Sequence, residues 1–298
     1  MFMLTRPRRS VLYMPGSNAK ALAKASTLPA DALILDLEDS VALDQKIAAR
    51  EQVVRAVRAG GFGGREVVIR INGPHTPWGE DDLIAAAAAK PDAILLPKVD
   101  GPGAIMVAAR VLREAQAPEG TRIWAMMETP NAILNAGSIA SVAADPSSRL
   151  SVMVMGLNDL AKETRARLTP GRPTMTVWLA SSVVAARAHG VDILDGVYND
   201  IKDLDGFRVE CLQGRDMGLD GKTLIHPSQI DICNEVFAPT PMEVESAAAI
   251  IEAFALPENA GKGVIQLNGR MVELLHADMA RRTLTIAEAI AERGKAAA

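Results

Sequence analysis

The sequence predicts a closed (β/α)₈ barrel with a C-terminal helical extension, and two observations lead to this fold. Eight short apolar runs recur along the chain, each bounded by Gly, Pro or charged residues, with starts roughly 20 to 40 residues apart. Segments of helical period, rich in Ala, Leu and charge, fill the gaps between them. Apolar strands that alternate with helices indicate a parallel sheet covered on both faces. Eight such units within about 230 residues fit a closed barrel better than an open doubly wound sheet, which stays the alternative fold.

The pattern divides the chain into a barrel over residues 8–237 and an extension over residues 238–298. The eight strands are expected at Ser10–Pro15, Ala32–Asp39, Glu66–Asn72, Ala93–Val99, Arg122–Thr129, Ser151–Asp159, Val191–Tyr198 and Thr223–Pro227. In the extension we expect a helix over Met242–Phe254 and a short apolar stretch over Gly261–Gly269 that ends in an Asn-Gly turn. A second long helix is expected over Met271–Arg293.

The composition excludes several classes of protein. The 298 residues carry a formal net charge of −4 and only 3 Trp, 2 Tyr and 5 Phe, which argues against a nucleic-acid partner. No stretch approaches the roughly 20 apolar residues of a membrane span, and Met1–Arg9 lacks the apolar run of a secretion signal. Cys211 and Cys233 follow no metal-binding or redox spacing. We therefore expect a soluble cytoplasmic protein without nucleic-acid or membrane partners.

Charged residues follow the predicted strands at the ends where a barrel keeps its active site. Side chains alternate along a strand, so Asp36 and Glu38 share one face while Leu35 and Leu37 share the other. The bulky apolar face must meet the helices, which turns the charged face into the barrel. The inward set comprises four acids and two bases, namely Asp36, Glu38, Glu128, Asp159, Arg70 and Lys98.

This surplus of carboxylates predicts a bound cation. A cavity of low dielectric constant disfavours unpaired carboxylates, so either some of them are protonated or a cation completes the site. Oxygen ligands without a nearby Cys favour Mg²⁺ or Mn²⁺. Glu128 and Asp159 lie at the ends of adjacent strands and are the expected ligand pair, with water or substrate at the remaining positions.

Structural roles compete with these functional ones. Asp39 and Asp159 could each cap the helix that follows. Asp36 is better explained as a buried partner of Arg70 or Lys98 than as a catalyst. His226 is better explained as a hydrogen-bonded residue at a strand end than as an acid or base.

The end of the first predicted strand is suited to bind an anion. Tyr13–Asn18 leads through a Gly-Ser-Asn turn into a helix that carries Lys20 and Lys24, and three arginines precede the strand. The start of a helix presents backbone N–H groups and a positive dipole end to an anion. A substrate that carries phosphate would suit this corner.

Seven segments, in order over nearly the whole chain, carry a family resemblance. They are Arg9–Gly16, Asp36–Val41, Val68–Gly73, Leu96–Lys98, Met127–Pro130, Gly156–Asp159 and Gly221–Pro227. Together they resemble the citrate lyase β-subunit-like family (HpcH/HpaI aldolase/citrate lyase), which includes malyl-CoA, β-methylmalyl-CoA and citramalyl-CoA lyases and a (3S)-malyl-CoA thioesterase branch. Trp124–Pro130 and Asn158–Glu163 are most similar to that thioesterase branch.

The resemblance implies a Mg²⁺-dependent barrel that acts on an acyl-CoA and assembles as a homotrimer or a hexamer. The implied metal ligands are Glu128 and Asp159, and the implied catalytic residues are Arg70, Glu38, Asp39 and Glu273. The implied substrate-binding residues are Tyr13, Pro15, Gly16, Lys24, Arg70, Lys98, Glu128, Asn158, Asp195 and Gly196. The C-terminal segment with Glu273 would complete the site of a neighbouring subunit.

The first hypothesis for the activity is a lyase that cleaves malyl-CoA, or a close relative, through a thioester enolate that Arg70 stabilises. Lyases of the family usually have Asp where this chain has Glu273, and one extra methylene moves the carboxyl group by about an ångström. This departure favours the alternative, a thioesterase that hydrolyses (3S)-malyl-CoA to malate and CoA. Two further hypotheses are a β-subunit of a citrate lyase-type complex and a metal-free aldolase with a Schiff base on Lys98. The acids beside Lys98 argue against the last, because they keep its amine protonated.

Overall fold

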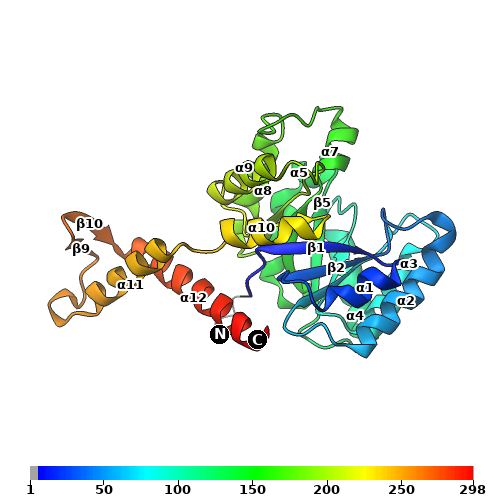
Figure 1. Cartoon of the computed structure of the whole chain (residues 1–298), viewed down its shortest axis with the longest axis horizontal. Helices are drawn as coiled ribbons and strands as arrows, with labels where there is room; N and C mark the ends of the chain where they lie inside the picture. Colours follow the sequence, from blue (N-terminus) through cyan, green and yellow to red (C-terminus); the bar gives the residue numbers. More distant parts are fainter. Residues whose placement is uncertain (1–5, 298) are drawn as a thin grey trace. The chain divides into compact units, whose positions relative to one another are not determined.

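The structure is a computed structural model that describes residues 6–297, and it contains a closed barrel of eight parallel strands (Figure 1). The strands are β1 Ser10–Pro15, β2 Ala32–Asp36, β3 Glu66–Arg70, β4 Ala93–Leu96, β5 Arg122–Met127, β6 Leu150–Met155, β7 Asp192–Asp195 and β8 Gly221–Leu224. Each strand pairs with the next along the chain, and β8 pairs with β1. The predicted barrel is confirmed, and the open sheet is excluded.

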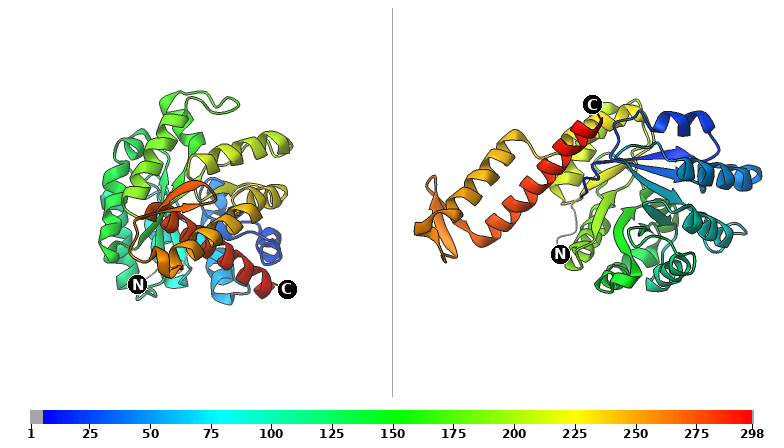
Figure 2. Two further views of the ribbon diagram at one scale, coloured as in Figure 1. Left: turned by 90° about the vertical axis from the view of Figure 1, so that its left-hand side faces the viewer. Right: turned by 90° about the horizontal axis from the view of Figure 1, so that it is seen from below.

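Helices connect the strands and cover the outside of the barrel (Figure 2). They are α1 Ala19–Ala25, α2 Lys46–Ala59, α3 Gly79–Ala89, α4 Pro102–Glu114, α5 Pro130–Leu134, α6 Ala136–Ser141, α7 Leu157–Thr164, α8 Thr176–Ala188, α9 Leu204–Asp216 and α10 Ile230–Val236. Most strands end a few residues before the apolar runs do. The polar residues at the ends of those runs therefore lie in the loops over the carboxyl end of the barrel, which we call the mouth.

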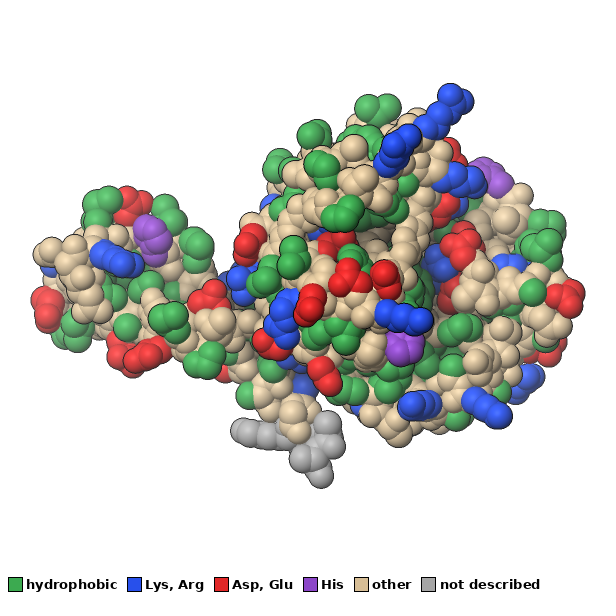
Figure 3. Space-filling view, turned by 45° about the horizontal axis from the view of Figure 1, so that its top comes forward, with side chains coloured by type: hydrophobic (Ala, Val, Ile, Leu, Met, Phe, Trp, Pro, Cys, Tyr) green, Lys and Arg blue, Asp and Glu red, His purple; other side chains and the backbone are tan. Residues whose placement is uncertain are grey.

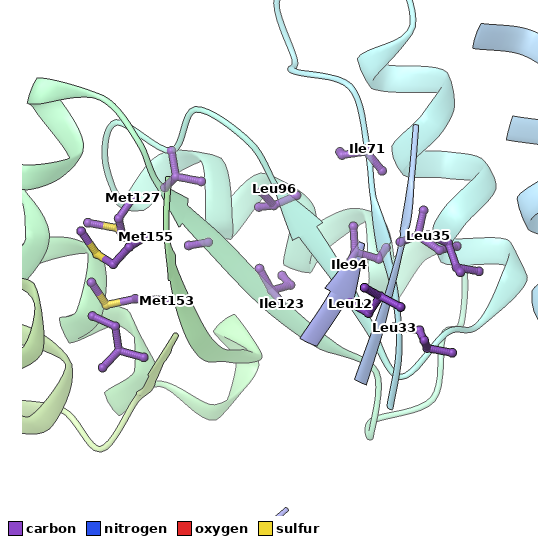
Figure 4. Close-up of a cluster of buried hydrophobic side chains, with 14 of the residues drawn as sticks. Leu12, Leu33, Leu35, Ile71, Ile94, Leu96, Ile123, Met127, Met153 and Met155 are labelled. Atoms are coloured by element: carbon purple, nitrogen blue, oxygen red, sulfur yellow. The ribbon is translucent and has the colours of Figure 1, made fainter. Parts of the chain in front are cut away.

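Two apolar layers hold the barrel together. Outward-facing side chains such as Leu33, Leu35 and Ile94 are fully buried against the helices (Figure 4). Ile34 and Leu95, one residue further along, belong to the separate cluster inside the barrel. Burial of one such side chain contributes about 1.5–3 kcal/mol. The predicted alternation is thus confirmed, and it fixes which strand-end residues face the mouth.

The chain divides into two compact units, of which the larger spans Arg8–Phe237. The smaller unit contains the residues from Ala238 onward together with Arg6 and Pro7. Its elements are α11 Pro241–Ala255, the strands β9 Val264–Leu267 and β10 Arg270–Glu273, and α12 Leu274–Ala297. No helix within residues 6–297 is both long enough and apolar enough to cross a membrane.

The expectation that the last helix begins at Met271 is wrong. Asn268 and Gly269 both have positive φ, 50° and 76°, as a tight hairpin turn requires. The turn directs the chain back as β10, where Val272 pairs with Ile265 and both are buried in the small core of this unit. Strand pairing overrides the helical pattern here, and α12 begins only at Leu274.

Candidate active site at the barrel mouth

An arginine–carboxylate cluster lies where β2 and β3 end. Arg70 donates from Nε and Nη2 to the two oxygens of Asp36, at 2.6 and 2.7 Å. Its Nη1 lies 2.9 Å from Glu38 Oε2 and 3.2 Å from Asp39 Oδ2. Asp36 is fully buried and also accepts hydrogen bonds from the Glu38 amide and from Ser40. The interpretation of Asp36 as a structural partner of Arg70 is confirmed.

Tyr13 supports this cluster from β1. The Arg70 guanidinium lies over the Tyr13 ring, 4.7 Å from its centroid, and the Tyr13 hydroxyl donates to Met126 Sδ at 3.6 Å. Burial raises the pKa of Tyr13 above its ordinary value, so the phenol is neutral at physiological pH. Stacking on the ring and pairing with Asp36 together fix the orientation of the guanidinium.

Glu38 is the mouth carboxyl group that holds a proton most readily. Burial raises the pKa of Glu38 to about 8, and the nearby Glu128 and Asp39 carboxylates act in the same direction, although Arg70 opposes them. At neutral pH Glu38 is therefore largely protonated. Protonation removes one charge from the surplus of carboxylates that the sequence predicts at the mouth.

Glu128 and Asp159 converge on the side chain of Lys98. The Lys98 ammonium lies 2.7 Å from Asp159 Oδ2 and 3.4 Å from Glu128 Oε1, and the Lys98 backbone amide donates to the same Glu128 oxygen at 2.7 Å. Burial raises the pKa of Glu128 to about 6, while Lys98 acts against this rise. Burial alone would lower the pKa of Lys98, but the two carboxylates raise it. The amine is thus a protonated ion-pair partner, which argues against a Schiff-base nucleophile.

Gly156 keeps the space that the Glu128 side chain needs, a role that the sequence analysis did not assign to it. A methyl group at Gly156 would lie 2.4 Å from Glu128 Cβ and 2.8 Å from Glu128 Oε2. The Gly156 amide also donates to the Met127 carbonyl at 3.0 Å, which joins the end of β5 to the loop after β6. Any larger residue at this position would displace Glu128 from its place beside Lys98.

The Glu128–Asp159 pair fits Mg²⁺ by the chemistry of its donors. Within residues 6–297 no three His, Cys, Asp or Glu side chains come together as a complete metal cage. Mg²⁺ does not require one, because it usually binds through one or two carboxylates and keeps water or substrate oxygens at its other positions. Both carboxylates already approach one positively charged nitrogen, so their oxygens converge on a single cation.

The Asp195 side chain forms part of a buried ion-pair network that stabilises the barrel. Its carboxylate is fully buried, accepts from Arg172 Nη1 at 2.6 Å and lies 3.0 Å from Lys222 Nζ. The backbone carbonyl of Asp195 accepts from Thr223. The carboxylate oxygens of Asp195 are thus paired away from solvent, which gives this side chain a structural role, and a substrate contact of the Asp195–Gly196 segment stays a prediction. The neighbouring Gly196 is half-buried.

The other predicted substrate-binding residues differ in exposure. Gly16 is buried, its amide donates to the Asp36 carbonyl at 2.8 Å, and a methyl group there would lie 2.6 Å from that carbonyl oxygen. Pro15 is half-buried, whereas Lys24 on α1 is exposed. Asn158, in the first turn of α7, is exposed and exchanges two amide hydrogen bonds with Asn199 in the loop after β7.

The capping alternatives for two of the acids are wrong. The N-cap of α7 is Gly156, and no side chain caps this helix, because it begins before Asp159. The short 3₁₀ helix after Asp39 has Ala42 as its N-cap, again without a side-chain cap. The interpretation of His226 is confirmed, since its ring nitrogen accepts from a backbone amide two residues on, at 3.2 Å.

Glu273 is the last residue of β10 and belongs to the smaller unit, whereas all the mouth residues belong to the larger one. Its backbone amide donates to His276 Nδ1 at 2.9 Å, which fixes the start of α12. The catalytic role of Glu273 stays a prediction.

Acidic and basic side chains are interspersed over the barrel face seen in Figure 3.

The fold and the mouth define a barrel enzyme whose site combines a fixed arginine with a converging pair of carboxylates. Residues 9–227 match the HpcH/HpaI aldolase/citrate lyase family, and the chain belongs to this family. It is 51% identical over 285 residues, 96% of each chain, to the (3S)-malyl-CoA thioesterase of Cereibacter sphaeroides. It is 36% identical over 289 residues, 95% of this chain and 94% of the other, to the citrate lyase subunit beta of Escherichia coli. The crystal structure of protein CitE from Mycobacterium tuberculosis in complex with magnesium, acetoacetate and coenzyme A covers 95% of this chain and 98% of that chain, with a TM-score of 0.74 and 28% identity.

Proposed function

We propose that this chain is a Mg²⁺-dependent thioesterase that hydrolyses (3S)-malyl-CoA to malate and CoA. One observation carries the choice of reaction. Relatives named (3S)-malyl-CoA thioesterase are 49–51% identical over at least 96% of the chain, whereas those named citrate lyase subunit beta are 32–36% identical. The sequence placed the carbon–carbon lyase first, and the comparisons give that reading no better support than the thioesterase.

The mouth residues supply the groups that this hydrolysis needs. Glu128 and Asp159 would hold Mg²⁺, which acts as a Lewis acid toward substrate oxygens when it is bound. Arg70 directs Nη1 toward the mouth, where it would stabilise the negative charge that develops on the thioester oxygen. Asp36 and Tyr13 orient the guanidinium before the substrate arrives, so little reorganisation is needed during the reaction.

Hydrolysis also needs a base that takes a proton from water while the water oxygen attacks the thioester carbon. The tetrahedral oxyanion then collapses, the C–S bond breaks, and CoA leaves as the thiolate with malate as the other product. We assign the base to Glu273, brought to the mouth by the smaller unit of a neighbouring copy in a homotrimer or hexamer. Large apolar side chains flank Glu273 and are exposed, Met271 by 68% and Leu274 and Leu275 by 52% each, as expected of a segment that another copy covers.

Substrate contacts are proposed for the mouth residues that remain accessible. Tyr13, Pro15 and Lys98 are half-buried around the charged cluster, and Asn158 is exposed in the first turn of α7. Lys24 on α1 would meet a phosphate of the CoA moiety, since it is exposed and carries no competing ion pair in the described part of the chain. The thioester group itself would contact Arg70 and a Mg²⁺ ion held by Glu128 and Asp159.

A lyase is the second candidate, and the 36% identity to a citrate lyase subunit beta favours it. In that reaction the bond between the methylene and carbinol carbons of malyl-CoA breaks, and the hydroxyl group loses its proton to give glyoxylate. The thioester enolate, stabilised by Arg70, then takes up a proton to give acetyl-CoA. A subunit of a citrate lyase-type complex is the third candidate, and it would be supported by a stable heteromeric partner on purification.

Two parallel assays on the purified protein with (3S)-malyl-CoA test the proposal. A thiol reagent measures free CoA, and phenylhydrazine measures glyoxylate, each with Mg²⁺ and with EDTA. The thioesterase releases thiol without glyoxylate, and EDTA abolishes the release. Glyoxylate without thiol identifies the lyase, and thiol release that survives EDTA contradicts the metal assignment.

A further inference from the structure

Lys98 contributes two different groups to the carboxylates of the mouth. Its φ of 52° lies in the left-handed region, which a lysine rarely adopts. The Lys98 amide donates to Glu128 Oε1 at 2.7 Å. Its ammonium lies between that oxygen and Asp159 Oδ2, at 3.4 and 2.7 Å. One residue thus contacts both of the carboxylates assigned to the metal.

The exposure of the three side chains makes their charges interdependent. The Glu128 side chain is 1% exposed, and those of Asp159 and Lys98 are 24% and 32% exposed. Without the ammonium, the two carboxylates would repel each other where little water screens them. A divalent cation between the same oxygens would in turn repel the ammonium. The ammonium and the divalent cation therefore exclude each other at this place.

We propose that Lys98 is an internal cation that stabilises the Glu128–Asp159 pair until a divalent cation displaces its ammonium. The inference rests on the metal site of the proposed function. The backbone amide of Lys98 keeps its hydrogen bond to Glu128 during the exchange, so the carboxylate stays oriented while its ionic partner changes. The freed ammonium remains near Glu38, which is the next carboxyl group that contributes to its electrostatics.

Isothermal titration of Mg²⁺ into the full chain tests this exchange. Lys98→Met removes the competing charge, and we expect Mg²⁺ to bind about tenfold more tightly, the equivalent of one charge-assisted hydrogen bond. Lys98→Arg keeps the charge and should bind Mg²⁺ no more tightly than the wild type. The matched control is Lys162→Met, which removes the same charge from an exposed position on α7, the helix that carries Asp159. It should change the affinity by less than about twofold.

The possible results of the titration separate a failure of the Lys98 exchange from a failure of the proposed metal site. Unchanged or weaker Mg²⁺ binding by Lys98→Met than by the wild type overturns the exchange and leaves the proposed function in place. Tightening of equal size in Lys162→Met also overturns it, because net charge alone would then explain the effect. A failure of every variant and of the wild type to bind Mg²⁺ overturns the exchange and the proposed metal site together.

A second variant and a second measurement guard against a folding defect. Lys98→Gly suits the left-handed backbone and keeps the amide that orients Glu128, so it should fold and bind Mg²⁺ as tightly as Lys98→Met. Without metal, both variants should have a lower Tm than the wild type, because the two carboxylates lose their partner. Mg²⁺ should then raise Tm more in the variants than in the wild type. An equal rise in all three proteins contradicts the proposal.

Discussion

Gly156→Ala tests whether the position of Glu128 sets the activity. The added methyl group would lie 2.4 Å from Glu128 Cβ, where ordinary contact begins at 3.4 Å, so one of the two must move by about 1 Å. Met126 Cε would lie 3.0 Å from the same point and further restricts the methyl group. Rotation about the side-chain bonds of Glu128 does not move its Cβ, so the backbone at Gly156 or at Glu128 must shift. Such a shift changes the position of the Glu128 carboxylate relative to Lys98 and Asp159.

Gly156→Ala should reduce the reaction rate strongly and the stability of the fold only moderately. A misplacement of about 1 Å in a group that positions the reaction costs about a hundredfold in rate. Overpacking of this kind costs about 1–3 kcal/mol in the free energy of unfolding, which leaves a protein of ordinary stability folded. Gly156→Ala should therefore remain folded while its kcat/KM falls about a hundredfold.

The assay is kcat/KM for (3S)-malyl-CoA in parallel with a thermal melt. Gly137→Ala is the matched control, because a methyl group on this α6 residue meets nothing within 4 Å. It should leave kcat/KM unchanged and raise stability slightly, since alanine favours a helix over glycine by about 0.5–1 kcal/mol. Wild-type kcat/KM in Gly156→Ala would refute the reasoning, because Glu128 would then tolerate a displacement that the structure makes unavoidable.

Three further changes test individual roles. Glu128→Gln should abolish Mg²⁺-dependent turnover with an unchanged circular dichroism spectrum, and full activity would remove Glu128 from the metal site. Glu273→Asp should raise the ratio of glyoxylate to free CoA among the products, because it restores the residue that the family resemblance assigns to lyases; an unchanged ratio counts against that role. Glu38→Gln should flatten the dependence of Tm on pH. The folded pKa of about 8 lies above the ordinary 4.5, so wild-type stability is lost as the pH rises through this window, and an equal slope in the variant would show that Glu38 does not cause it.

The alternation of side chains along strands made much of the mouth predictable. Asp36 and Arg70 could be placed on the inner face because Leu35 and Ile69 had to meet the helices. Because both side chains face the inside of the barrel, an ion pair between Asp36 and Arg70 was among the roles expected for Asp36. A period of two residues is a local property, so it can be recognised without knowledge of the rest of the fold.

Contacts that depend on unusual backbone or distant partners could not be predicted. The Lys98 amide donates to Glu128 and the Lys98 backbone is left-handed, and neither feature can be recognised from a lysine in the sequence. Asp195 was expected to contact substrate, yet it pairs with Lys222 from β8 and with Arg172, 23 residues earlier in the chain. The importance of Gly156 arises from the close approach of its backbone to the Glu128 side chain, a distance that the sequence pattern does not contain.

The most direct test of the proposed hydrolysis is mass spectrometry of the products formed from (3S)-malyl-CoA and Mg²⁺ in ¹⁸O-labelled water. Attack of water on the thioester carbon predicts free CoA and malate with one ¹⁸O in the carboxyl group released from CoA. Acetyl-CoA and glyoxylate as the products, without labelled malate, would contradict the thioesterase and establish carbon–carbon cleavage at the same mouth.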